Sequence, residues 1–326
     1  MPHRRCRYVK RTVLVWIVAA VLGAADAGAD YKQAYAYYQQ QRYDKAIQEL
    51  KPDLDQNPDW EFGHRLVGLS YLALKNNALA VASLSRAVQL KSNTPSTYLG
   101  LAQAYFNMKR YDNTLQALAQ GEPFIKTADD RYKVFYLKGS AEYALEKYSE
   151  AANDCAAALR EKGGSGGDWT IYSQLGIAYF NLKRYDEAIQ ALQKALTLKP
   201  GHNVTAEFLG KSYFRKGVAA LQAKQYDAAI EQLRKARESA PKDGFISYNL
   251  GEAHLFLKNY SEAERAYNQA LEQMPRSAEV FQRLGLVYEK QKKWELSLNA
   301  YNKANELNPT PGLKEAIDRV AEQKKR

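Results

Sequence analysis

The hydrophobic pattern of residues 169–201 predicts two helices joined by a turn. In the first half, apolar or small residues recur at steps of three and four, at Tyr172, Leu175, Gly176 and Tyr179. In the second half they recur at Ala188, Leu192 and Ala195, and Pro200 follows. Both spacings place one apolar stripe on a helix, and proline ends the second one. The unit is therefore a helical hairpin whose turn lies near the KRYD segment.

This unit recurs along most of the chain. The phrase YFNMKRYDN at 105–113 returns as YFNLKRYDE at 179–187. With Trp169 as position 1, the units start at 27, 61, 95, 132, 169, 210, 244 and 278, and the recurrent step is 34 residues. Position 8 is always glycine or alanine, and position 20 is alanine in most units. Small residues at both positions let two helices approach closely.

These residues resemble the tetratricopeptide repeat (TPR) family, whose unit carries the same aromatic, Leu-Gly, Tyr, Ala and Pro skeleton. The resemblance covers residues 27–311. It implies an all-α fold, an α-solenoid of eight helix-turn-helix hairpins that forms a right-handed superhelix with a concave groove lined by the first helices. We expect residues 311–326 to form a C-terminal capping helix, because the last repeat needs a cover for its apolar face.

Three places depart from the regular repeat. Three extra residues precede repeats 4 and 5, and we expect loops there. Before repeat 5 the segment 162–168 is rich in glycine, which predicts a flexible linker. Repeat 6 starts seven residues late, and since seven residues are almost two helical turns, we expect one long first helix over 203–224.

Residues 1–29 are expected to be a signal peptide. A basic head precedes the apolar stretch at 13–25, and small residues offer cleavage sites up to Ala29. The alternative is an uncleaved N-terminal anchor, but the apolar stretch is shorter than the roughly 20 residues that span a membrane. Cleavage removes five basic residues and one acidic residue, and the net charge falls from +11 to +7. We therefore expect a periplasmic or secreted protein.

Catalytic and metal-binding motifs are not recognisable in the sequence. Gly163 to Gly167 spells G-x-S-x-G, but no predicted strand precedes it and no histidine lies near it. His64, His202 and His254 lack paired-ligand spacing, and Cys155 occupies a core position. We expect no enzyme activity, no metal and no cofactor.

First-helix positions 2, 5, 9 and 12 face the concave groove in TPR proteins. At positions 5 and 12 of this chain, the resemblance implies an apolar and aromatic groove. Its lining residues would be Tyr31, Tyr38, Leu72, Leu99, Phe106, Tyr136, Tyr143, Phe180, Phe214 and Tyr248. Position 9 never carries the asparagine with which some TPR proteins grip a peptide carboxylate. The alternative, left open here, is that these side chains pack the first helices together.

The pattern favours a non-catalytic scaffold of the cell envelope that binds a protein or peptide in this groove. A secreted chain rarely meets nucleic acid, so we expect no nucleic-acid partner. The alternative is a basic surface binder of anionic lipid or polysaccharide, acting through the excess of positive charge.

Overall fold

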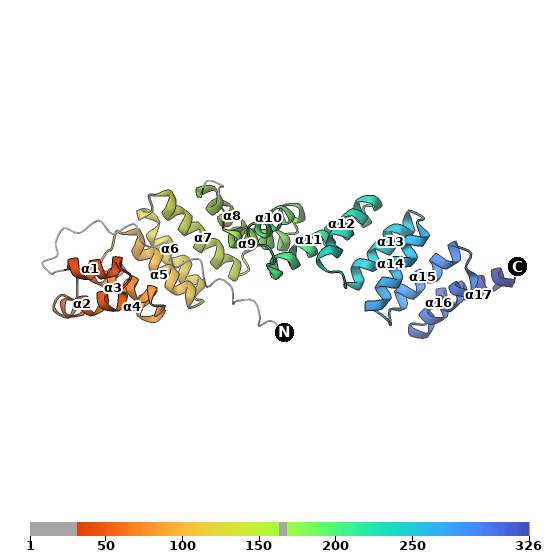
Figure 1. Cartoon of the computed structure of the whole chain (residues 1–326), viewed down its shortest axis with the longest axis horizontal. Coiled ribbons are helices and arrows are strands. Elements are labelled where there is room, and N and C mark those ends of the chain that lie inside the picture. Colours follow the sequence, from red (N-terminus) through yellow and green to blue (C-terminus); the bar gives the residue numbers. More distant parts are fainter. Residues whose placement is uncertain (1–30, 163–167, 326) are drawn as a thin grey trace. The chain divides into compact units, whose positions relative to one another are not determined.

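The computed structural model describes residues 31–162 and 168–325. The expected signal peptide and residues 163–167 of the glycine-rich linker lie outside this part of the chain. All regular elements of the described residues are helical (Figure 1): seventeen α-helices and one short 3-10 helix, η2 (Glu122–Phe124). The α-helices are α1 (Tyr31–Gln39), α2 (Tyr43–Gln56), α3 (Glu61–Ala73), α4 (Asn77–Gln89), α5 (Pro95–Asn107), α6 (Tyr111–Gly121), α7 (Ala128–Ala144), α8 (Tyr148–Glu161), α9 (Trp169–Asn181), α10 (Tyr185–Leu198), α11 (Asn203–Gln222), α12 (Tyr226–Ser239), α13 (Gly244–Phe256), α14 (Tyr260–Gln273), α15 (Ala278–Lys290), α16 (Trp294–Leu307) and α17 (Pro311–Lys325).

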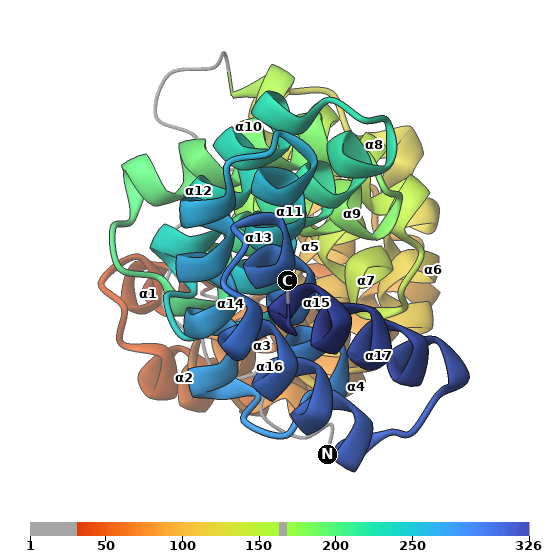
Figure 2. The same cartoon turned by 90° about the vertical axis from the view of Figure 1, so that its right-hand side faces the viewer.

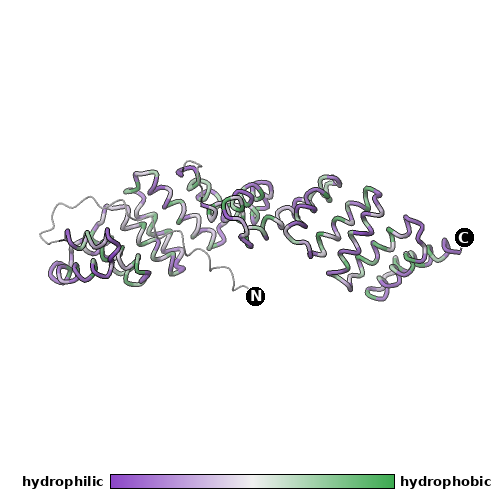
Figure 3. Tube along the Cα trace, in the orientation of Figure 1, coloured by the Kyte–Doolittle hydropathy of each residue, from purple (hydrophilic) through white to green (hydrophobic). Residues whose placement is uncertain are grey.

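Consecutive helices pack as antiparallel pairs, which confirms the predicted all-α fold of helical hairpins. Contacts join α1 to α2, α3 to α4, α5 to α6, α7 to α8, α11 to α12, α13 to α14 and α15 to α16. Hydropathy alternates along each helix (Figure 3), as expected for helices that bury one stripe and expose the other. Among residues 31–162 and 168–325, no helix combines the length and the apolar character needed to cross a membrane.

The glycine at position 8 is where the two helices of a hairpin approach most closely. A Cβ atom at Gly68 would lie 2.6 Å from the Leu84 side chain, and one at Gly217 would lie 2.7 Å from Leu233. Leu84 and Leu233 both occupy position 24 of their repeats and are fully buried. The position 24 side chain therefore fills the space that the glycine leaves empty.

Each hairpin turn contains one residue in the left-handed region. In the turn between α13 and α14, Lys258 has a φ of 62°. Its N–H donates to the Leu255 carbonyl at 2.9 Å, and the Asn259 N–H donates to the His254 carbonyl at 2.8 Å. These two bonds are those of a Schellman turn, which usually has glycine at the left-handed position. The same position 15 is left-handed at Gln41, Lys75, Lys109, Glu146, Lys183, Lys224 and Lys292.

Two first helices are longer than the rest. α11 begins at Asn203 and ends at Gln222, close to the predicted long helix. Before repeat 4 the expected loop is instead a helical turn, because α7 begins at Ala128. The Thr127 hydroxyl accepts a hydrogen bond from the Asp130 N–H at 3.0 Å and donates to its carboxylate at 2.7 Å, and this cap makes the extra turn stable.

The chain divides into two compact units, Met1–Ala178 (unit 1) and Tyr179–Arg326 (unit 2), and the division falls within α9. In unit 1 the fully buried side chains include Leu50, Leu66 and Leu118. In unit 2 the capping helix α17 packs on α16 at the C-terminal end (Figure 1 and Figure 2). Its Leu313 and Val320 are buried there against the preceding helices.

Candidate functional site

First helices of successive hairpins contact one another. In unit 1 these contacts join α1 to α3, α3 to α5 and α5 to α7, and in unit 2 they join α11 to α13. The ten side chains expected to line a groove lie on these helices and on α9. Four of them, Tyr38, Leu72, Leu99 and Tyr136, are buried. The other six, Tyr31, Phe106, Tyr143, Phe180, Phe214 and Tyr248, are half-buried and remain accessible in part.

Two of the position 5 tyrosines bridge neighbouring first helices. The Tyr31 ring on α1 meets the Phe62 ring on α3 edge-on, with 5.1 Å between centroids. The Tyr248 hydroxyl on α13 donates to a Glu279 carboxylate oxygen on α15 at 2.6 Å. Phe62 and Glu279 both occupy position 2 of the following repeat. These tyrosines therefore contribute to the packing between repeats, whatever else they bind.

Aromatic side chains at position 12 pack against the tyrosine at position 17 of the same hairpin. Phe106 meets Tyr111 edge-on at a centroid distance of 5.6 Å, and Tyr38 meets Tyr43 in the same way at 5.5 Å. Phe180 lies 5.8 Å from Tyr185 and also meets Phe208 at 5.2 Å. Phe106 and Phe180 nevertheless remain half-buried, so part of each side chain is accessible to solvent.

The most exposed aromatic side chain on α13 was not among the groove residues predicted from positions 5 and 12. Phe245, at position 2 of repeat 7, is 64% exposed. It lies one turn before the half-buried Tyr248 on the same helix. The signal was present in the sequence, because position 2 also faces the groove in TPR proteins. Phe256 is 53% exposed as well, but its ring stacks on Tyr226 at 5.1 Å.

A buried carboxylate interrupts the apolar character of this face in unit 2. Glu252, at position 9, is 7% exposed. It accepts a hydrogen bond from the Tyr267 hydroxyl and forms an ion pair with Arg283 at 3.0 Å. Burial raises the pKa of the Glu252 carboxyl, while the Tyr267 hydroxyl and Arg283 act in the opposite direction. The two partners satisfy the buried charge, so Glu252 serves the contact between α13, α14 and α15.

The structure also describes Cys155 and the side chains that could act as metal ligands. Cys155 is buried, and burial followed by the nearby Asp154 and Glu142 carboxylates raises the pKa of its thiol to about 12. A thiol with so high a pKa carries almost no thiolate at neutral pH and is a poor nucleophile. Within residues 31–162 and 168–325, no three or more His, Cys, Asp or Glu side chains are grouped so that they could hold a metal ion.

Comparisons with known proteins show which proteins this chain resembles. It is 37% identical over 81 residues to the BBSome complex member BBS4 of Bos taurus, a match that spans 25% of this chain and 14% of that protein. The MamA 41-end structure from Desulfovibrio magneticus RS-1 matches 55% of this chain and 95% of its own, with 25% identity and a TM-score of 0.38. A MamA AMB-1 structure matches 58% and 98%, with 26% identity and a TM-score of 0.41. At these TM-scores the likeness carries no inference about function.

Three family models, each described as a tetratricopeptide repeat, match the second half of the chain. They cover residues 169–202, 220–284 and 278–311. The ranges 169–202 and 278–311 begin where the sequence period places repeats 5 and 8. The matches together support assignment of residues 169–202 and 220–311 to the TPR family.

Proposed function

We propose that this protein is a non-catalytic interaction scaffold that binds a protein or peptide on the first-helix face of unit 2. The observation that carries the proposal is the 64% exposure of Phe245, beside the half-buried Tyr248 on α13 and Phe214 on the adjoining α11. The TPR matches support it, since TPR proteins generally bind protein partners. An aromatic side chain left in water at such a site is a typical interface anchor.

Binding through Phe245 is expected to be hydrophobic. Covering the exposed part of one phenylalanine contributes about 1–2 kcal/mol at about 25 cal/mol per Å² of buried apolar surface. An apolar peptide side chain that packs on Phe245 would exclude water from its ring. Such a contact depends weakly on salt, whereas binding of an anionic lipid or polysaccharide by dispersed basic residues weakens steeply as ionic strength rises.

A site-specific crosslinker tests the proposal. p-Benzoyl-phenylalanine placed at 245 should crosslink one partner in the native cell envelope at both low and high salt. The matched control places it at Leu296, which is 46% exposed on the second helix α16. Phe214→Ala should weaken the crosslink from 245 and leave the helical content unchanged. Equal crosslinking from both sites, or none from 245, would reject the first-helix face as the binding site.

We further propose that the protein acts in the bacterial periplasm or at the cell surface after cleavage of residues 1–29. The basic head and short apolar stretch support this. Intact-mass measurement of the exported protein tests it. The measured mass is expected to correspond to a chain that begins at Gly28 or Asp30. A mass that corresponds to a chain still carrying residues 1–20 would indicate an anchored protein instead.

A further inference from the structure

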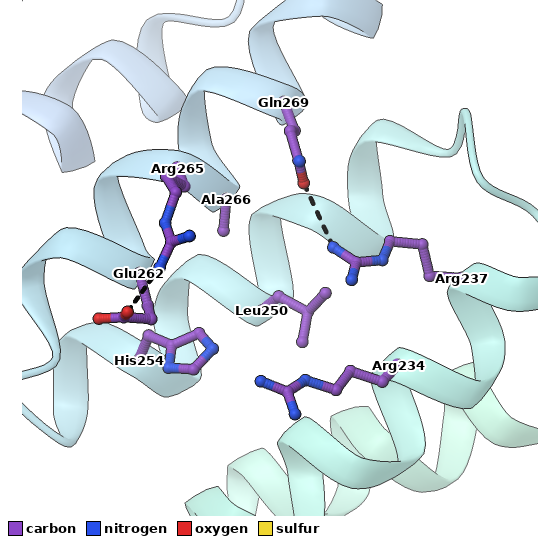
Figure 4. Close-up of a pocket in the computed structure, with 8 residues that line it drawn as sticks. All are labelled: Arg234, Arg237, Leu250, His254, Glu262, Arg265, Ala266 and Gln269. Carbon is purple, nitrogen blue, oxygen red and sulfur yellow. Dashed lines mark hydrogen bonds and ion pairs between the residues drawn. The ribbon is translucent and has the colours of Figure 1, made fainter.

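A cavity of about 210 Å³ lies between α12, α13 and α14 in unit 2. Figure 4 shows Arg234 and Arg237 reaching it from α12 and Arg265 lying above it on α14, with His254 on α13 opposite Arg234. Glu262 is the one carboxylate in the lining. Three guanidinium groups against one carboxylate leave the cavity with an excess of positive charge, even with a neutral His254.

The three arginines differ in how far their charge is already satisfied. Arg265 pairs with Glu262 at 2.6 Å, and both side chains are exposed. Arg237 donates to the Gln269 side-chain oxygen at 3.3 Å, a long bond to a neutral acceptor. Arg234 makes no hydrogen bond or ion pair with any described residue. Two guanidinium groups therefore face the cavity without an anionic partner.

His254 also has an unused hydrogen-bonding atom at this place. Its side chain is 8% exposed, and its Nδ1 atom is buried without a hydrogen-bond partner. Burial lowers the pKa of the imidazole, and Arg234, Arg265 and Arg237 lower it further, while Glu262 acts in the opposite direction. The imidazole thus lies in a positive electrostatic field produced by side chains from both flanking helices.

The floor of the cavity is apolar. Leu250 on α13 and Ala266 on α14 are both buried and line it. A second cavity of about 580 Å³ shares Arg234, Arg237 and Gln269 with the first. Its further lining includes Lys242 and the two carboxylates of Glu238 and Glu272, so its excess of positive charge is smaller than that of the first cavity. A ligand with an aliphatic stem and an anionic end fits the first cavity, and the second leaves room for the chain that carries it.

We propose that this cavity binds the carboxylate of a glutamate side chain in an acidic peptide segment. Arg234 and Arg237 supply planar guanidinium groups that match a carboxylate. Leu250 and Ala266 contact the side-chain methylenes. Glu262 disfavours a dianionic phosphate at the same place, because it adds a third negative charge nearby. The three arginines of the site lie on the second helices α12 and α14, and none of its lining residues is among those proposed to bind a partner on the first-helix face. The two proposals can therefore be tested separately.

The test uses a capped peptide of alternating glutamate and serine, and a matched peptide with glutamine in place of glutamate. Isothermal titration of the purified protein should detect the glutamate peptide only, and binding should weaken as salt is raised. Arg234→Gln should weaken it about ten-fold or more, as expected when a charged hydrogen bond is lost. Arg215→Gln, an exposed arginine on α11 outside the cavity, should leave it unchanged.

A second readout separates this site from general surface charge. In a proton NMR titration, a bound carboxylate should raise the pKa of the His254 imidazole, because it offsets the field of the three arginines. The His254→Gln variant assigns the signal. An unchanged imidazole pKa at saturating peptide overturns the proposal, as does equal weakening by Arg215→Gln and Arg234→Gln. Tighter binding of inorganic phosphate or of an oligouronate than of the glutamate peptide overturns the assignment to an acidic peptide.

Discussion

Gly251→Ala should destabilise unit 2, although the same substitution stabilises most helices. Gly251 lies inside α13 at position 8, where alanine would be favoured by about 1 kcal/mol over glycine on helix propensity alone. A Cβ atom built there would lie 2.6 Å from Cε1 and 2.7 Å from Cδ1 of Tyr267. Carbon atoms do not approach so closely, so either α13 or the Tyr267 ring must move.

Neither can move freely. The Tyr267 ring is fully buried, and its hydroxyl donates to the buried Glu252 carboxylate. Overpacking of a core typically costs 1–3 kcal/mol, and displacing the hydroxyl from a buried carboxylate costs about 1–3 kcal/mol more. After the helix-propensity gain of about 1 kcal/mol is subtracted, we expect a net loss of about 1–5 kcal/mol.

Urea denaturation followed by circular dichroism measures this loss, and hydrogen exchange of the α13 and α14 amides locates it. Gly285→Ala should also lower the free energy of unfolding, because its Cβ would lie 2.6 Å from the Tyr301 ring. Gly312→Ala is the control, since no heavy atom lies within 4 Å of the added Cβ. A Gly251→Ala protein as stable as the wild type would refute the close approach of α13 to Tyr267.

Two further predictions concern a buried carboxyl and a strained turn. Burial and the Asp154 carboxylate raise the pKa of Glu142 to about 8, so its contribution to stability is fully present below the ordinary carboxyl pKa and is lost as pH rises through about 8. Thermal melts from pH 5 to pH 9 should show this fall, and Glu142→Gln should reduce it; parallel curves would contradict the assignment. Lys258→Gly should raise the free energy of unfolding by about 0.5–1 kcal/mol, because φ is 62° there, whereas Gln282→Gly inside α15 should lower it.

The sequence alone determined the helices and their pairing. Helix formation follows a local period, so the apolar stripe of each helix and the small residues at positions 8 and 20 were enough to predict the hairpins. The length of α11 followed in the same way, because a seven-residue insertion keeps the same stripe buried. The start of α7 was missed, since the Thr127 cap competes locally with the loop that an insertion suggests. The left-handed turns were also hidden, because lysine rather than glycine occupies most of them.

Only the tertiary structure decided which side chains meet and which stay in water. Phe245 and Tyr248 lie on one helix, yet the neighbouring α15 provides Glu279 as a partner for Tyr248 and leaves Phe245 largely exposed. The cavity beside His254 arises because three successive helices bring Arg234 and Arg265, which are far apart in the sequence, to one place. A repeat pattern assigns each position to one face of its helix, but the partner that a side chain meets and the electrostatic field around it depend on distances in space.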